Sequence, residues 1–218
     1  MGDKPSTTRR PGRPKADSTE VPAERDVLLR GLEAFATLGY DRASARELAR
    51  RLGVGPTFIN DRYGSKAAYW RAVVDAALGA QLEGMVPPAP GSDDEGVVRQ
   101  FVMEFYRVSI GQPYLAMLMA DESARDTERL DYLYQRYIEP TLSRVVPSIE
   151  RLMASGGMTR VPMDVVFFAI IAPVSGLVHE PLARRLGSPE RMQQADRHAR
   201  AEALAGLVVD GLLATRHQ

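Results

Sequence analysis

Hydrophobic residues recur every three or four positions through most of the chain, which is the period of an α-helix. Leu28, Leu32 and Phe35 form the first such stripe. Gly39 follows as a stop signal, so one amphipathic helix is predicted from about 23 to 38. The alternation typical of strands is nowhere sustained, and no internal repeat is visible. The pattern therefore predicts an all-α protein.

Helix boundaries in the next segment follow from caps and prolines. Ser44, with Glu47 three residues later, has the spacing of a capping box. Pro56 suits the first turn of a helix, because its missing N–H is not needed there. Ser65 is a further candidate N-cap. These signals predict three more helices, at 44–52, 55–62 and 65–85.

The remainder of the chain also has helical periodicity, after a proline-rich break at 87–92. The helices expected there lie near 94–110, 113–120, 126–154, 162–179 and 189–214, with Gly and Pro at the junctions. Residues 1–22 differ from the rest, because they contain four prolines and five basic residues and almost nothing apolar. Such a segment cannot offset the entropy of ordering, so we expect a mobile arm.

Charge is distributed unevenly along a chain whose formal net charge is zero. Through Arg71 there are 14 basic and 9 acidic residues. This asymmetry is typical of a protein with an N-terminal nucleic-acid-binding domain followed by a domain that does not bind nucleic acid. Cysteine is absent, no apolar stretch follows the N-terminal basic residues, and the apolar run 165–174 is about half the roughly 20 residues that a membrane span needs. We expect a cytoplasmic protein without a membrane partner.

Short helices joined by a tight turn at 52–55 form the pattern of a helix-turn-helix DNA reader. The motif residues are Ala34-Phe35, Gly39-Tyr40, Ser44-x-Arg46-Glu47-Leu48-Ala49, Leu52-Gly53-Val54, Ile59 with Tyr63, and Ser65-Lys66. Over residues 24–74 the chain resembles the tetracycline-repressor (TetR) family of bacterial transcription regulators. Composition predicts the arm at 1–22. The resemblance implies a three-helix DNA-binding domain at 23–70 and a helical-bundle effector-binding and dimerisation domain at 71–218.

Candidate DNA contacts are identified partly from the electrostatics of helix N-termini and partly from this resemblance. Ser44 and Ser65 stand at helix N-termini, where free N–H groups favour a phosphate. The resemblance implies that Lys66 touches the DNA backbone and that Arg46 can reach a base edge, although a solvated helix charge explains Arg46 equally well. The complete set of expected contacts is Ser44, Arg46, Pro56, Thr57, Phe58, Asn60, Arg62, Ser65 and Lys66, with Arg10 and Arg13 of the arm.

The expected recognition helix departs from its family at several positions. Asn60 replaces an aromatic phosphate contact, and Gly55 and Pro56 replace the usual Ser and Lys or Arg. Asp61 would repel phosphate unless it accepts from cytosine N4 or pairs with Arg62. Two other functions therefore stay open: a helical ligand-sequestering or enzymatic domain with a degenerate DNA-binding unit, and an architectural protein that binds DNA without specificity through its basic arm.

The C-terminal body suggests a partner subunit and a small ligand. Residues 165–174 are apolar on every face, so we expect a subunit interface to cover them. The last helix has a stripe of small and branched residues suited to close helix packing. The resemblance implies that these last two long helices form the homodimer interface. The stripe consists of Ala201, Leu204, Ala205, Val208 and Leu212. Tyr and Met suit adaptable apolar pockets, and the expected effector-binding residues are Tyr106, Met117, Tyr134 and His179.

No catalytic motif is present in the sequence. The three histidines are scattered, no cysteine exists, and no phosphate-binding or nucleophile motif occurs, so we expect no catalytic residues, no metal site and no cofactor. The sequence thus favours a dimeric regulator of transcription that binds a pseudo-palindromic double-stranded DNA operator. Repression, relieved by a small apolar or amphipathic effector, is what the resemblance implies.

Overall fold

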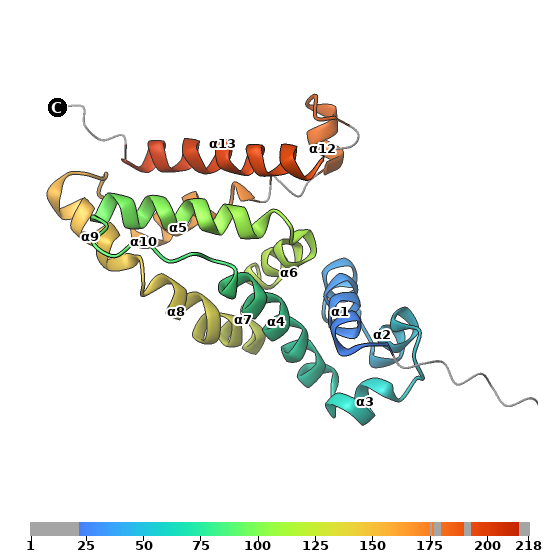
Figure 1. Ribbon diagram of the computed structural model, residues 1–218. Coiled ribbons are helices and arrows are strands. Elements are labelled where there is room, and N and C mark those ends of the chain that lie inside the picture. The colour runs from blue at the N-terminus through green and yellow to red at the C-terminus, as the bar shows by residue number, and fades with distance from the viewer. Residues whose placement is uncertain (1–21, 175, 177–179, 190–192, 214–218) are drawn as a thin grey trace, which may run out of the picture.

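The computed structural model describes residues 22–174, 176, 180–189 and 193–213. Every regular element within these residues is a helix, which confirms the all-α prediction (Figure 1). The expected arm at 1–22, with Arg10 and Arg13, lies outside the described residues except for its last position. His179 lies outside them as well.

The first two helices begin and end close to where the sequence predicts. Helix α1 comprises Glu24–Leu38 and α2 comprises Ala45–Leu52. The Oγ of Ser44 accepts a hydrogen bond from the backbone N–H of Glu47 at 3.1 Å, as expected of a capping box. The reciprocal bond is not made, because the Glu47 carboxylate accepts hydrogen bonds from Arg50 and Arg51 instead.

The third helix is shorter than predicted. Helix α3 comprises Phe58–Tyr63, so the expectation that Pro56 occupies its first turn is wrong. Pro56 and Thr57 form a turn in which the Phe58 N–H donates to the Gly55 carbonyl at 3.0 Å. The chain can reverse sharply after α2 because Gly53 adopts a left-handed conformation with φ of 71°.

Helix α4 comprises Lys66–Glu83 and connects the helix-turn-helix to the body (Figure 1). The Oγ of Ser65 caps it by accepting from the N–H of Ala68 at 3.0 Å, as predicted. Its N-terminal half buries Tyr69, Trp70, Val73 and Val74 against α1 and α3. The Tyr69 hydroxyl donates to the Val27 carbonyl at 2.7 Å, which joins α4 to α1.

The body is divided into more helices than the sequence suggests. Its elements are α5 Asp94–Ser109, α6 Pro113–Ser123, α7 Glu128–Leu133, the π-helix η1 Tyr134–Ile138, α8 Glu139–Leu142, α9 Val146–Ser155, α10 Met163–Ile171, α12 Glu180–Arg185 and α13 Gln194–Leu213. The single helix expected at 126–154 is therefore wrong. Pro140 cannot donate to the carbonyl of Arg136 and crowds it, so the chain widens into the π-helix. Pro147 lies in the first turn of a new helix, α9.

Two hydrophobic clusters hold the described residues together. The first contains the buried residues of α1 to α4 together with Leu115 and Leu118 of α6 and Leu133 of α7. The second contains buried residues of α5, α9, α10 and α13. The expected domain boundary at residue 70 falls inside α4, and α6 and α7 pack on the N-terminal unit. A displacement of α6 or α7 would therefore act directly on the helices that carry the DNA-binding motif.

Candidate DNA-binding interface and effector region

Helix α3 lies at one end of the molecule, far from α13 (Figure 1). Ile59 is completely buried in the first cluster, whereas Thr57 and Asn60 are exposed on the opposite side of the same turn. Most of the expected DNA contacts are exposed: Ser44, Arg46, Pro56, Thr57, Asn60, Arg62 and Ser65. Phe58 and Lys66 are half-buried. The structure thus brings the described members of the predicted set to α2, α3 and the start of α4.

One acidic residue of α1 holds the end of α3. The hydroxyl of Tyr63 donates to Glu24 Oε1 at 2.8 Å, and the guanidinium of Arg62 forms an ion pair with the same carboxylate. The possibility that Asp61 pairs with Arg62 is therefore wrong, because Arg62 reaches across to α1. Asp61 is exposed and has no ion pair among the described residues. Sequence reasoning missed Glu24, whose partners lie 38 and 39 positions away.

Lys66 stands against an aromatic ring at the start of α4. Its Nζ donates to the Tyr40 carbonyl at 3.0 Å and lies 4.0 Å from the centroid of the Tyr40 ring. A cation over an aromatic face is attracted by the ring quadrupole. The contact orients Lys66 toward the loop between α1 and α2. Sequence reasoning used Tyr40 as a motif residue only and missed this role.

The basic residues of α2 differ in how far they are already paired. Glu47 Oε1 lies 2.7 Å from Arg50 Nη2 and 3.2 Å from Arg51 Nε. Hydrogen bonds from these two guanidinium groups lower the pKa of Glu47 to about 2, so its charge is retained at neutral pH. Arg46 is exposed and makes no hydrogen bond or ion pair with any described residue. Arg46 is therefore free to contact a ligand.

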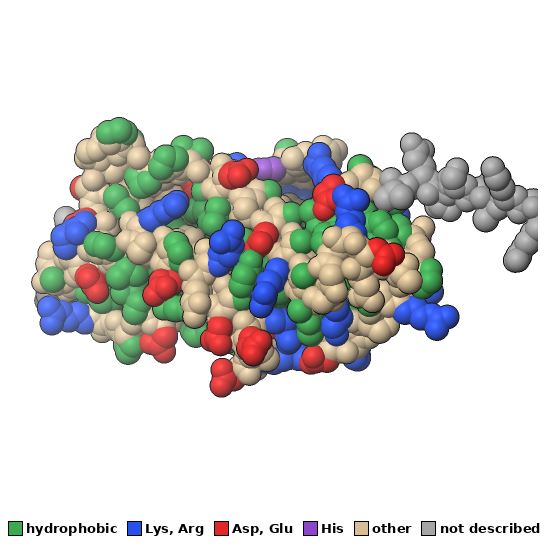
Figure 2. Space-filling view, turned by 90° about the horizontal axis from the view of Figure 1, so that it is seen from below, with side chains coloured by type: hydrophobic (Ala, Val, Ile, Leu, Met, Phe, Trp, Pro, Cys, Tyr) green, Lys and Arg blue, Asp and Glu red, His purple; other side chains and the backbone are tan. Residues whose placement is uncertain are grey.

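Acidic and basic side chains are interspersed on the face that includes the underside of the helix-turn-helix (Figure 2). This mixture agrees with the zero net charge of the chain. It indicates that DNA contact depends on particular side chains rather than on one uniform basic patch.

The exposed polar turn and helix α3, supported by α1 and α4, define a helix-turn-helix protein. Residues 27–73 match the model of a family described as "Bacterial regulatory proteins, tetR family". A comparison with curated protein sequences finds no match.

Solved structures support the same fold. PfmR, a TetR family transcriptional regulator from Thermus thermophilus, is 19% identical over 88% of this chain and 98% of that chain, with a TM-score of 0.61. A TetR family transcription regulator from Marinobacter aquaeolei is 15% identical over 86% of this chain and 94% of that chain, with a TM-score of 0.59. FadR from Bacillus subtilis, solved in complex with stearoyl-CoA, is 13% identical over 87% of this chain and 100% of that chain, with a TM-score of 0.57.

Residues 27–73 therefore form a helix-turn-helix unit similar to the N-terminal domain of bacterial regulatory proteins of the tetR family. The all-α fold of the chain is the one shared by these solved regulators. None of the described helices is long and apolar enough to cross a membrane. The described residues also contain no group of three or more side chains suited to hold a metal ion.

The expected effector-binding residues do not meet in one cavity of the described structure. Tyr106 is completely buried in the second cluster, and its hydroxyl donates to the Ile170 carbonyl at 2.9 Å. Burial raises the pKa of Tyr106 to about 12, so it remains a neutral donor. Met117 and Tyr134 are exposed on α6 and η1. None of the three lines either of the two cavities described below.

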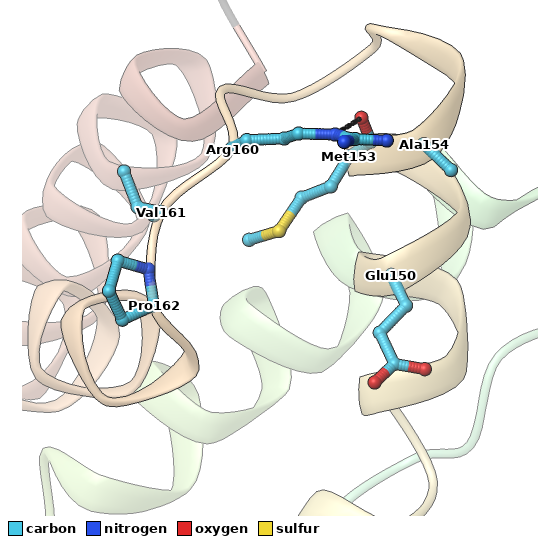
Figure 3. Close-up of a pocket in the computed structure, with 6 residues that line it drawn as sticks. All are labelled: Glu150, Met153, Ala154, Arg160, Val161 and Pro162. Atoms are coloured by element: carbon cyan, nitrogen blue, oxygen red, sulfur yellow. Dashed lines mark hydrogen bonds between the residues drawn. The ribbon is translucent and has the colours of Figure 1, made fainter.

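A cavity of about 400 Å³ lies between α9 and the segment that precedes α10 (Figure 3). Its lining residues are Glu150, Met153, Ala154, Arg160, Val161 and Pro162. The Met153 side chain points across the gap toward Val161 and Pro162. Arg160 Nε donates to the Met153 carbonyl at 3.3 Å, which closes one end of the gap. This cavity is remote from the first hydrophobic cluster.

Part of the apolar surface of α10 and α13 stays uncovered in a single chain. Val166 and Ile170 of α10 are buried, whereas 57% of Phe168 is exposed. On α13, 73% of Leu207 is exposed. The predicted stripe on α13 packs mainly within its own chain, because Ala201 and Ala205 are buried in the second cluster.

Proposed function

We propose that this regulator acts as a homodimer and represses transcription by occupying a pseudo-palindromic operator. The observation that carries the proposal is the anchored geometry of α3. Ile59 and Tyr63 hold the helix to the first cluster and to Glu24, while Thr57 and Asn60 face solvent. A rigid helix with one exposed polar side is what insertion into a major groove needs.

Arg46 is the proposed base contact, because it is exposed and unpaired among the described residues. A guanidinium that is not held by a carboxylate can donate two hydrogen bonds to guanine O6 and N7. Ser44, Ser65 and Lys66 are the proposed phosphate contacts, because they lie at the N-termini of α2 and α4. Arg62 is proposed to add a weaker contact at the edge of the site, since Glu24 already neutralises its charge.

The uncovered apolar surface supports the homodimer. Phe168 and Leu207 belong to α10 and α13, which lie against each other in the second cluster. A second copy of the chain would remove these side chains from water, which is favourable by about 25 cal/mol per Å² of apolar surface. Two subunits related by a two-fold axis would present their α3 helices to successive major grooves, about 34–36 Å apart or a multiple of that distance.

Selection of duplexes from a random pool by the full chain tests DNA reading. A symmetric pair of half-sites is the expected result. Enrichment of A·T-rich duplexes without symmetry would instead support binding through the basic arm. No enrichment at all would support a ligand-sequestering or enzymatic role and overturn the proposal.

Sedimentation of Phe168→Glu tests the interface. A buried charge without a partner is costly, so this variant is expected to shift the dimer toward monomer at micromolar concentration. Val86→Glu is the matched control, because Val86 is similarly exposed but lies in the loop after α4. A monomeric wild-type chain, or equal effects of the two substitutions, would contradict the proposed interface.

Release by a small apolar or amphipathic effector completes the proposal. Its support is the fold shared with FadR, which was solved with stearoyl-CoA, an amphipathic molecule. Effector and operator must weaken each other by the same factor, because binding free energies are linked. Titration of stearoyl-CoA with and without the selected duplex measures both factors. Equal affinities in the two titrations would show that this compound binds without releasing DNA.

A further inference from the structure

A second cavity lies where the DNA-binding helices meet the body. It has a volume of about 210 Å³, and its lining residues are Tyr40, Ala67, Trp70, Arg71, Glu128 and Arg129. These residues come from the loop after α1, the first two turns of α4 and the start of α7. The volume is below the about 300–1,000 Å³ of pockets for drug-sized ligands, so the cavity suits a small molecule.

The indole of Trp70 leaves a hydrogen-bond donor without a partner. Trp70 is only 1% exposed, and its Nε1 has no acceptor among the described residues. A buried unsatisfied donor costs about 1–3 kcal/mol relative to a paired one.

Cations gather around the cavity. Lys66 Nζ and Arg129 Cζ each lie 4.0 Å from the centroid of the Tyr40 ring. Arg71 Cζ lies 5.3 Å from the centroid of the Tyr132 ring and has no carboxylate partner among the described residues. The buried carboxylate of Glu122 offsets only Arg129, whose Nε donates to both of its oxygens at 2.9 Å.

We propose that this cavity binds a small aromatic carboxylate of about the size of benzoate. The guanidinium of Arg71, still without a counter-ion, pairs with the carboxylate. Ala67 and the ring of Trp70 form apolar walls for the aromatic part. Inorganic phosphate has the charge but no apolar part, so it uses only half of this site. Glu128 disfavours a second negative charge and limits the ligand to a monoanion.

The position of the cavity links its ligand to DNA binding. The Tyr40 ring contacts Arg129 of the cavity lining and also Lys66, the proposed phosphate contact. An anion bound beside Arg71 lowers the local positive potential that favours DNA phosphate near Lys66. We therefore expect the carboxylate to weaken DNA binding. This second half of the inference rests on the proposed function, whereas ligand binding itself does not.

Calorimetric titration of the full chain with benzoate, in the absence of DNA, tests the site. Benzamide has nearly the same shape without the charge. It is expected to bind at least about tenfold more weakly than benzoate, because charge-assisted hydrogen bonds are about twice as strong as neutral ones. Inorganic phosphate is expected to bind weakly for lack of apolar contact. Equal affinity for benzoate and either of these compounds would overturn the assignment.

Two variants locate the binding. Arg71→Gln is expected to weaken benzoate by about tenfold, and it leaves the buried Glu122–Arg129 pair intact. Arg144→Gln is the matched control, because Arg144 is an exposed arginine in the turn between α8 and α9. Ala67→Leu fills the cavity while retaining every charge and is also expected to weaken binding. Equal affinity of Arg71→Gln and Arg144→Gln for benzoate would show that the site lies elsewhere.

Anisotropy of a labelled duplex tests the link to DNA. Benzoate is expected to raise the Kd of the wild-type chain for DNA and to have much less effect on Arg71→Gln. Benzoate binding with an unchanged Kd for DNA would overturn the link but not the site. A chain that binds no duplex without benzoate would contradict the proposed function, and the calorimetric result would still decide the site.

Discussion

Replacing Gly31 with alanine is expected to destabilise the protein, although alanine is the better helix former. Gly31 is buried in α1 where α4 crosses it. A Cβ at this position would meet the Tyr69 hydroxyl first, and then Tyr69 Cζ and Val73 Cγ2 at 2.7 Å. Tyr69 cannot simply turn away, because it is completely buried and its hydroxyl donates to the Val27 carbonyl.

The size of the destabilisation follows from three effects, of which one stabilises the variant and two destabilise it. Alanine in a helix interior is favoured over glycine by about 1 kcal/mol. Overpacking a buried site costs about 1–3 kcal/mol. Loss of the hydrogen bond between Tyr69 and Val27 costs about 1 kcal/mol more. The net change is a destabilisation of about 2 kcal/mol, which lowers the Tm of a chain of this size by about 4–8 °C.

Thermal unfolding followed by circular dichroism, at one protein concentration, measures this change. Gly79→Ala in α4 is the matched control, because a Cβ there meets nothing within 4 Å. The control is expected to gain about 0.5–1 kcal/mol in stability. Combining Gly31→Ala with Tyr69→Phe removes the nearest clashing atom. The double variant should therefore lose less stability than the sum of the losses in the two single variants. A higher Tm for Gly31→Ala, comparable to that of Gly79→Ala, would refute the packing of α1 on α4.

Three further results are expected. Lys66→Ala should weaken binding to all duplexes alike and lower the salt slope by about one unit per subunit, whereas Arg46→Ala should cost roughly 1–3 kcal/mol on the selected site only. Equal losses on selected and scrambled DNA would make Arg46 a phosphate contact. The pKa of Glu47 is lowered from 4.5 to about 2, so its stabilising contribution is present above pH 4.5 and is lost as the pH falls toward 2. NMR titration of its carboxyl group should show this low midpoint, and Arg50→Ala should raise it. Deleting residues 1–15 should reduce DNA affinity and its salt dependence without changing the Tm, and a lower Tm would show that this segment packs on the core.

Several features could be read from the sequence because they depend on near neighbours. The caps Ser44 and Ser65 bond to N–H groups three residues away, so their chemistry is visible in a short window. The helical period and the glycine at position 53 likewise act locally, and together they predicted the all-α class and the helix-turn-helix. The same local signals failed at 126–154, where the hydrophobic period continues but Pro140 alters the backbone hydrogen bonding.

Only the tertiary structure decided which of these side chains have partners. Glu24 contacts Arg62 and Tyr63 because α1 and α3 pack together. These partners lie 38 and 39 positions from Glu24, so a local sequence pattern does not connect them. Tyr106 is of a residue type that suits a ligand pocket. In the folded chain, however, its hydroxyl donates to the Ile170 carbonyl, 64 positions away. Helical periodicity shows that one face of a helix is apolar, but not which surface covers it. The sequence determined the elements through local hydrogen bonding, whereas the contacts that orient α3 and line the cavities arise between segments that only folding brings together.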